Sequence, residues 1–187
     1  IEPAPPPMSE RLPSGERGVA HRWLVLLVRI AKFLAAASFG EDALGQVLAW
    51  LADDCGFSRN VIAIRNEEGD ELAAVATFGI DRETATKMRY RAFEGITGQV
   101  FATGVPAFVP QLQADPVFLD RSGLRSTLDR SKLAFFCVPI KDRDIVIGTL
   151  SADRPNTDIK DADADLMLLA EVAQLLAPFL QRHRLEE

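Results

Sequence analysis

Three glycines within residues 94–106 constrain the fold of this chain more than any other feature. Gly95 and Gly98 lie at the start of a short apolar run, and Gly104 follows it, two residues before Pro106. Glycine readily adopts the left-handed conformation that often ends a helix, and a proline disfavours a helical conformation of the residue before it. The segment therefore predicts a loop, one short helix over residues 97–103, and an extended strand over residues 107–109.

Two nearly continuous apolar runs follow, over residues 133–140 and 145–152, with a polar turn at residues 142–144. Such runs are typical of central strands that are covered on both faces. A similar pair occupies residues 60–65 and 72–78, and the polar residues around Gly69 separate its two members. The chain therefore contains two predicted antiparallel hairpins.

Helical periodicity marks both ends of the chain. Residues 23–38 carry apolar side chains at spacings of four, three, four and three, a second apolar helix spans residues 44–55 and stops at Gly56, and residues 161–183 repeat apolar positions in the same way. We expect the terminal helices to form a homodimeric helical bundle through Trp23, Leu27, Ile30, Leu34, Leu169, Ala173, Leu176 and Leu180. The alternative is that both stripes only cover the sheet of their own chain.

Composition limits the number of domains and the kind of partner. A chain of 187 residues with 48% apolar residues can form one core, which we assign to a single globular domain over residues 19–185. Residues 1–18 contain five prolines among small and charged residues, so we expect a disordered tail there. The formal charge of −6 disfavours direct binding of nucleic acid.

No pattern of catalytic or metal-binding residues is present in the sequence. Cys55 and Cys137 lie in apolar contexts without nearby histidines, so we interpret them as core residues, the alternative being a redox pair or an iron site. We find no Ser-His-Asp order and no phosphate-binding glycine loop, and we expect no enzyme activity and no cofactor. Arg29 and Lys32 interrupt the apolar stretch of residues 23–38, and nothing resembles a signal peptide, so a cytoplasmic location is expected.

Three motifs in a fixed order give the chain a family resemblance. They are EGITGQVFATGVP at residues 94–106, DPVFLDRSG at residues 115–123, and the paired strands within residues 136–155. Over roughly residues 22–183 the chain resembles a GAF domain, and within that family it is most similar to the amino-terminal regulatory domain of NifA-type activators of nitrogen fixation. The resemblance implies an α+β fold: an antiparallel sheet of about six strands, with terminal helices on one face and a lid of loops and a short helix on the other.

The resemblance also implies a ligand beneath the lid, in the space under residues 90–131. Several arginines lie in this region, and guanidinium groups bind carboxylates, so a small anion is the expected ligand, although loop arginines are often only solvated. The predicted ligand-binding residues are Tyr90, Ile96, Phe118, Arg121, Arg125, Arg130, Phe136 and Val138. For NifA-like domains the resemblance implies 2-oxoglutarate as effector, and a PII-type protein or a NifL-like antiactivator as partner. The alternative is a ligand-free module for dimerisation or protein interaction.

Activators of this type continue into an ATPase module that acts on σ54 polymerase and then into a helix-turn-helix. Neither is found within the 187 residues. We therefore expect the chain to be part of a longer activator or a free-standing sensor.

Overall fold

The computed structural model describes residues 14–38, 40–112 and 132–184. The helices are α2 (Ser14–Ala36), α3 (Glu41–Cys55), α4 (Arg82–Lys87), α5 (Gly95–Thr103), the short 3-10 helix η3 (Asn156–Asp158) and α6 (Ala162–Arg184). The strands are β1 (Arg59–Arg65), β2 (Glu71–Phe78), β3 (Arg89–Arg91), β4 (Ala107–Val109), β5 (Leu133–Asp142) and β6 (Ile145–Pro155).

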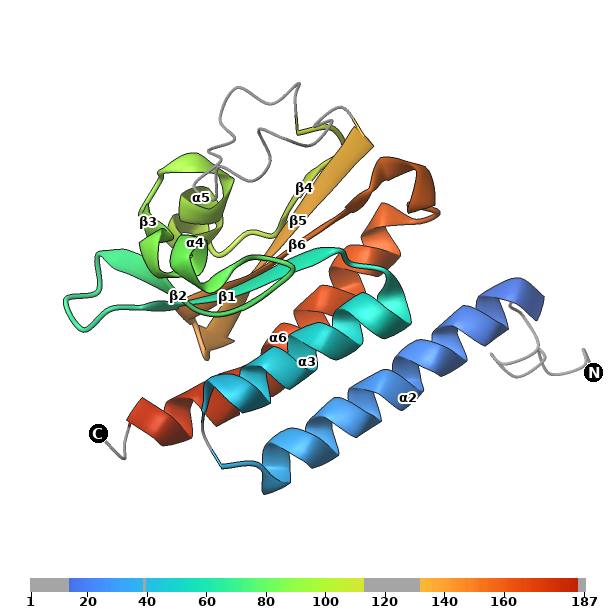
Figure 1. The fold of residues 1–187 in the computed structure, drawn as a ribbon, viewed down its shortest axis with the longest axis horizontal. Helices are drawn as coiled ribbons and strands as arrows, with labels where there is room; N and C mark the ends of the chain where they lie inside the picture. Colours follow the sequence, from blue (N-terminus) through green and yellow to red (C-terminus); the bar gives the residue numbers. More distant parts are fainter. Residues whose placement is uncertain (1–13, 39, 113–131, 185–187) are drawn as a thin grey trace, which may run out of the picture.

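The strands form one six-stranded sheet in the order β3-β2-β1-β6-β5-β4 (Figure 1). Every neighbouring pair in it is antiparallel. The two longest runs of the sequence became β5 and β6, and β6 lies near the centre of the sheet beside β1. The predicted α+β fold with a central antiparallel sheet is therefore confirmed.

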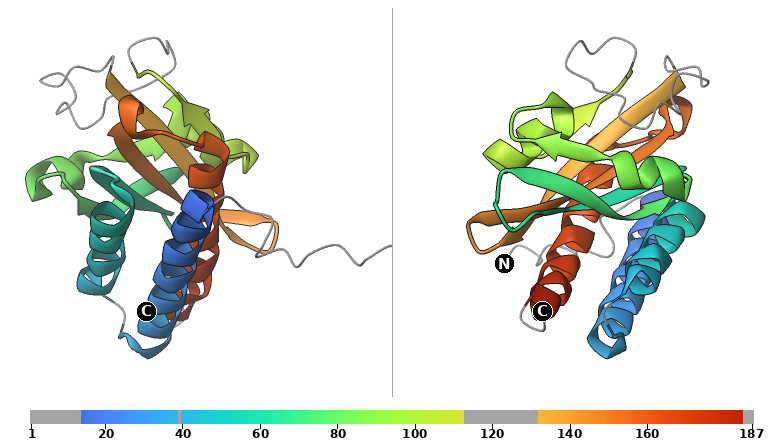
Figure 2. Two further views of the ribbon diagram at one scale, coloured as in Figure 1. Left: turned by 90° about the vertical axis from the view of Figure 1, so that its right-hand side faces the viewer. Right: turned by 60° about the vertical axis from the view of Figure 1, so that its left-hand side comes forward.

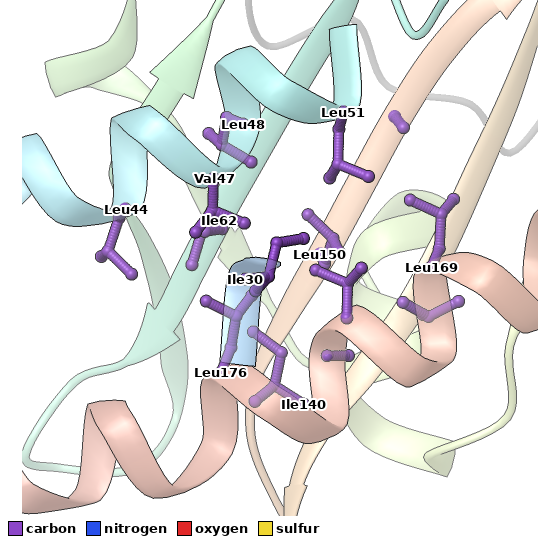
Figure 3. Close-up of a cluster of buried hydrophobic side chains, with 14 of the residues drawn as sticks. Ile30, Leu44, Val47, Leu48, Leu51, Ile62, Ile140, Leu150, Leu169 and Leu176 are labelled. Atoms are coloured by element: carbon purple, nitrogen blue, oxygen red, sulfur yellow. The ribbon is translucent and has the colours of Figure 1, made fainter. Parts of the chain in front are cut away.

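Three helices cover one face of this sheet, which we call the helix face. α3 and α6 lie against the strands, and α2 packs on the outer side of these two helices (Figures 1 and 2). α2 and α6 run in the same direction, and Arg182 of α6 donates a hydrogen bond to the carbonyl of Leu34 over 2.8 Å. Figure 3 shows the resulting core, in which Ile30 of α2 reaches the side chains of the two inner helices and of the central strands.

The opposite face of the sheet, which we call the lid face, carries the short helices α4 and α5 (Figure 1). α5 ends at Gly104, whose φ of 66° is left-handed and whose N–H donates to the carbonyl of Val100. At Gly98 a β-carbon would collide with the carbonyl oxygen of Arg91, so only glycine lets α5 pack so tightly against the turn that precedes it. The predicted short helix bracketed by glycines is confirmed, and it begins at Gly95.

The predicted boundary of the tail is wrong. α2 begins at Ser14, so residues 14–18 belong to a helix and not to a disordered segment. Proline is compatible with the entry to a helix because the first helical N–H groups have no partner within the helix, and Pro13 directly precedes Ser14. Residues 1–13 and 113–131 lie outside the described residues, and with them the motif of residues 115–123.

Candidate functional site

A row of polar side chains crosses the centre of the lid face. Side chains of a strand alternate between the two faces, and residues paired across an antiparallel ladder share a face. Asn60 donates hydrogen bonds to the carbonyls of Leu48 and Phe57, so it lies on the helix face. Its neighbours Arg59 and Val61 therefore face the lid, together with their β6 partners Asp153 and Ser151.

The polar row continues along β6 with Thr149, which pairs with Ala63 of β1. Thr97 of α5 reaches the same face, because its side chain forms a hydrogen bond with the thiol of Cys137 on β5. All of these groups are buried in the isolated chain. The sequence thus places hydroxyl groups along the middle of an otherwise apolar sheet, directly under the lid helix.

Two separate apolar clusters border this row. One, on the β1, β2 and β3 side, consists of Val61, Ala63, Leu72, Met88, Tyr90 and Phe101. The other, on the β4 and β5 side, consists of Ile96, Val100, Val109, Leu112, Phe135 and Cys137. α5 contributes Phe101 to the first cluster and Ile96 and Val100 to the second, so it spans β6 from one side to the other. Apolar flanks with a few polar groups between them are the residue composition that small-molecule sites share.

One buried ion pair lies at the end of the row. Arg59 Nη2 lies 3.0 Å from Asp153 Oδ2, and the side chains are only 7% and 1% exposed. Buried charges are tolerated when they are paired, and removal of one partner leaves the other uncompensated. This pair supplies both a guanidinium and a carboxylate to the lid face.

The cysteines have the properties of core residues. Burial raises the pKa of the Cys137 thiol to about 12, although its hydrogen bond with Thr97 acts in the opposite direction. Burial also raises the pKa of Cys55 to about 12, with Asp54 adding to the effect. Thiols of this kind stay protonated at neutral pH and are poor nucleophiles.

Only part of the predicted ligand-binding set lies on the lid face. Tyr90 and Ile96 are buried there, in the two different apolar clusters. Phe136 and Val138 are on the helix face instead, where they join the main core. Their assignment is corrected for a geometric reason: they alternate with Phe135 and Cys137, and β5 is apolar on both faces, so hydrophobicity alone does not reveal which set faces which layer.

The predicted arginines do not mark the site in the described part of the chain. Arg121, Arg125 and Arg130, like Phe118, lie outside the described residues. Arg89 and Arg91, which belong to the same basic region, are exposed and lie 3.8 and 3.9 Å from carboxylate oxygens of Glu71. The site residues that sequence reasoning missed are Thr97, Thr149, Ser151 and Arg59. The sequence did contain a signal for the residues of β6, because Thr149, Ser151 and Asp153 occupy alternate positions of an otherwise apolar strand.

The predicted dimer residues also need correction. Ile30, Leu34, Leu169, Ala173, Leu176 and Leu180 are all buried in the core of their own chain. Trp23 and Leu27 are half-buried and pack against the same core. Six of the eight predicted residues therefore pack into the core of their own chain, whereas Trp23 and Leu27 keep part of their surface exposed.

A different face of α2 is exposed. Leu24, Val25 and Val28 are 59, 53 and 45% exposed, which is high for aliphatic side chains. Lys32 lies one helical turn after Val28 on the same exposed side of the helix. These three residues, the outer stripe, form an apolar strip on the surface of the bundle, with Lys32 beside it.

Within the described ranges, no three His, Cys, Asp or Glu side chains come together in a way that could hold a metal ion. Nor does any helix in this part of the chain have the length and hydropathy needed to cross a membrane.

Known proteins with similar sequences are regulators of nitrogen fixation. The chain is 32% identical over 163 residues to a Nif-specific regulatory protein of Azospirillum brasilense, a match that covers 86% of the chain and 26% of the relative. It is 29% identical over 165 residues to the nitrogen fixation protein AnfA of Azotobacter vinelandii, covering 88% of the chain and 31% of the relative. The chain thus spans about a quarter to a third of the length of these relatives.

Solved structures with the same fold include the GAF domain of A. aeolicus nlh2 in an inactive state, with a TM-score of 0.77 and 24% identity over 88% of this chain and 99% of that one. A free methionine-R-sulfoxide reductase from Neisseria meningitidis has a TM-score of 0.73 and 22% identity over 91% of this chain and 94% of that one. At these identities the likeness concerns the fold alone. The family match itself spans residues 40–178, which is most of the sequence, and the chain belongs to the GAF domain family.

Proposed function

We propose that this chain is the regulatory sensor domain of a NifA-like, σ54-dependent activator of nitrogen fixation. The observation that carries the proposal is the buried row of hydroxyl groups on β6, covered by α5, in a chain that resembles Nif-specific regulators over 86% of its length. A small effector binds between the two apolar clusters of the lid face. The change is passed to the helices on the other face, and no catalysis is involved.

The effector that the family resemblance suggests is 2-oxoglutarate. Its carboxylates and keto group are hydrogen-bond acceptors, and Thr97, Thr149 and Ser151 carry hydroxyl donors on the lid face. The guanidinium of Arg59 is held by Asp153, so the hydroxyls are the better candidates for direct contact. Arg121, Arg125 and Arg130 remain candidates for the charge partners of a dicarboxylate.

Calorimetry with 2-oxoglutarate at millimolar concentration tests this proposal. We expect saturable heat with the intact protein and its loss in Thr149→Val, because the substitution keeps the volume of the side chain and removes its hydroxyl. Thr86→Val is the matched control: Thr86 is exposed on α4, where its hydroxyl donates to the carbonyl of Glu83. Equal binding by both variants contradicts a role for Thr149 in effector binding.

A homodimer is the second part of the proposal, now through the outer stripe of α2 and not through its buried side. Three exposed aliphatic residues on one 23-residue helix favour self-association. Val28→Lys should shift the protein to monomer in analytical ultracentrifugation, because it adds a charge to the apolar strip one helical turn from Lys32. Met167→Lys is the control, since Met167 is 62% exposed on α6 and lies outside the stripe. A wild-type monomer at all concentrations would falsify the dimer.

The second candidate function is a ligand-free interaction module, controlled by a PII-type protein or a NifL-like antiactivator. It is favoured by one observation: the polar row is already buried in the chain without any ligand. If 2-oxoglutarate gives no heat while a purified PII-type protein binds saturably, this function replaces the first.

A further inference from the structure

Two consecutive residues near the end of β6 form buried ion pairs on opposite faces of the sheet. Asp153 faces the lid and pairs with Arg59. Arg154 faces the helices, where its Nη1 lies 2.6 Å from Asp165 Oδ2 of α6. Both pairs are largely shielded from solvent, the second with side chains 13 and 6% exposed. A single peptide unit in a central strand therefore carries one charge of each pair.

Arg154 also contacts the end of α3. Its Nη2 donates a hydrogen bond of 2.7 Å to the carbonyl of Cys55, the last residue of that helix, and its guanidinium lies 4.9 Å from the centre of the Phe57 ring. The last carbonyls of a helix have no partner within it, and a positive charge is favourable there. Asp165 lies in the first turn of α6, where a negative charge is favourable. Arg154 therefore connects the end of α3 to the beginning of α6.

The backbone of Asp153 also makes direct hydrogen bonds. Its carbonyl accepts hydrogen bonds from the backbone N–H of Ser58 over 2.9 Å and from the Ser58 hydroxyl over 3.3 Å. Ser58 lies between the end of α3 and the start of β1, next to Arg59. The backbone of Asp153 is therefore tied to the segment that joins α3 to β1, and the side chain of the next residue, Arg154, contacts both helix ends.

The cluster around Arg154 leaves one donor unused. Among the described residues, the buried Nε of Arg154 has no hydrogen-bond partner. A buried donor without an acceptor costs free energy, and a polar network that is only partly satisfied is less firmly held in one arrangement than a complete one. This partly satisfied polar network lies on the helix face, at the point where the sheet contacts α3 and α6.

We infer that Asp153 and Arg154 form a connection through the sheet that couples the arrangement of the lid face to the first turn of α6 and the last turn of α3. Asp153 and Arg154 are positioning residues in this scheme. This connection is the route by which binding at the lid face would regulate the helices of the proposed sensor. The inference rests on the proposed function only for the identity of the molecule that binds at the lid. The coupling itself is a property of the free chain.

Hydrogen exchange of the effector-free protein tests the inference. Asp153→Asn should accelerate exchange of the amides of Ala164 and Asp165 in α6 and of Gly56 after α3 by at least about fivefold, which corresponds to about 1 kcal/mol. These amides donate to groups of Asp161 and Ala52, so their exchange reports the two helix ends. The capped amide of Thr84 in α4 should not change.

Two controls separate coupling from general destabilisation. Val61→Ala removes buried volume from the lid face and lowers global stability, but it changes neither ion pair. In this variant, exchange of the helix-end amides should rise no more than the change in global unfolding accounts for. In an Arg154→Lys background, which keeps the charge but loses the planar guanidinium, Asp153→Asn should no longer change exchange in α6. If Arg154→Lys does not fold, Asp165→Asn serves as the background.

Exchange changes confined to the strands on the lid side would overturn the inference, as would an undiminished effect in the Arg154→Lys background. The measurement uses no effector. A failure of calorimetry with 2-oxoglutarate therefore leaves this test intact, and a failure of the exchange test leaves effector binding open to its own experiment.

Discussion

The two faces of one sheet carry different side chains along its central strand β6 and at the β1 residues that pair with it. On the helix face, Ile62 of β1 pairs with Leu150 of β6, and both side chains are fully buried in the main core. One residue further along, Ala63 pairs with Thr149 on the lid face. Large aliphatic side chains join the sheet to α3 and α6, whereas small and hydroxylated ones lie under α5. The helix face therefore supplies the larger aliphatic core, and the lid face carries the polar groups on which the proposed effector binding rests.

The sharpest test of this comparison replaces two adjacent residues of β5. Phe136→Ala should destabilise the protein by about 3 to 5 kcal/mol, because the ring is fully buried against Phe57 and Phe108. Cys137→Ala, on the lid face, should cost about 1 kcal/mol because little volume is removed. Urea unfolding followed by circular dichroism measures both. Equal losses would contradict the asymmetry between the faces.

A pair of glycines tests how closely each face is packed. Gly98→Ala should destabilise the protein by about 1 to 3 kcal/mol, because the new methyl group collides with the carbonyl oxygen of Arg91 at the base of the lid. Gly45→Ala in α3 should stabilise by about 0.5 to 1 kcal/mol, because nothing lies within 4 Å of a β-carbon there and alanine favours the helix. Thermal unfolding of the two variants should therefore shift in opposite directions. A shift in the same direction would show that the close approach of α5 is not a constraint.

The buried thiols predict a loss of stability in alkaline solution. The folded chain keeps Cys137 protonated because burial raises the pKa of its thiol to about 12, whereas the unfolded chain ionises near the ordinary pKa of about 8.5. The folded state therefore binds the thiol proton more tightly than the unfolded state does. The stabilisation that results is complete below pH 8 and is lost as the pH rises toward 12. Between pH 8 and pH 10 the free energy of unfolding should fall by about 1 to 2 kcal/mol for this thiol. Cys137→Ala should lose less over the same interval in urea titrations, and an identical loss would contradict the shifted pKa.

The smallest expected effect concerns the ion pair on the helix face. Burial raises the pKa of Asp165, and Arg154 opposes that increase through its charge and its hydrogen bond. Arg154→Lys should therefore raise the pKa of Asp165 further, because the guanidinium contact is lost. Carbon-detected NMR titration of the carboxyl group measures the change. A lower pKa in the variant would mean that Arg154 is not the main group that stabilises the carboxylate.

Much of the fold could be predicted from residue patterns. The glycines around residues 95–104 anticipated α5, the two long apolar runs anticipated β5 and β6, and the periodic termini anticipated α2 and α6. The candidate site was less predictable. Tyr90 and Ile96 were assigned to the correct face, but Phe136 and Val138 were not, because a strand that is apolar on both sides has no visible inside or outside.

The bundle illustrates the same limit. The stripe from Trp23 to Leu34 was identified correctly as a helix seam, yet its partner proved to be the chain itself. An apolar stripe requires burial, but it does not specify which surface provides it. The exposed outer residues Leu24, Val25 and Val28 became distinguishable only when α2 was packed against α3 and α6.

Local chemistry in the sequence by itself determined the order of helices and strands, the turn glycines and the membership of the GAF family. These properties depend on neighbouring residues and on hydrophobic periodicity, and both can be read directly from the amino-acid sequence. The tertiary structure alone decided that Thr149, Ser151 and Asp153 share a face with Thr97, and that Asp153 and Arg154 pair with charges on opposite sides of the sheet. The register of β1 against β6 brings Arg59 to Asp153, 94 positions away, and the packing of α5 and α6 against the sheet brings Thr97 and Asp165 to its two faces.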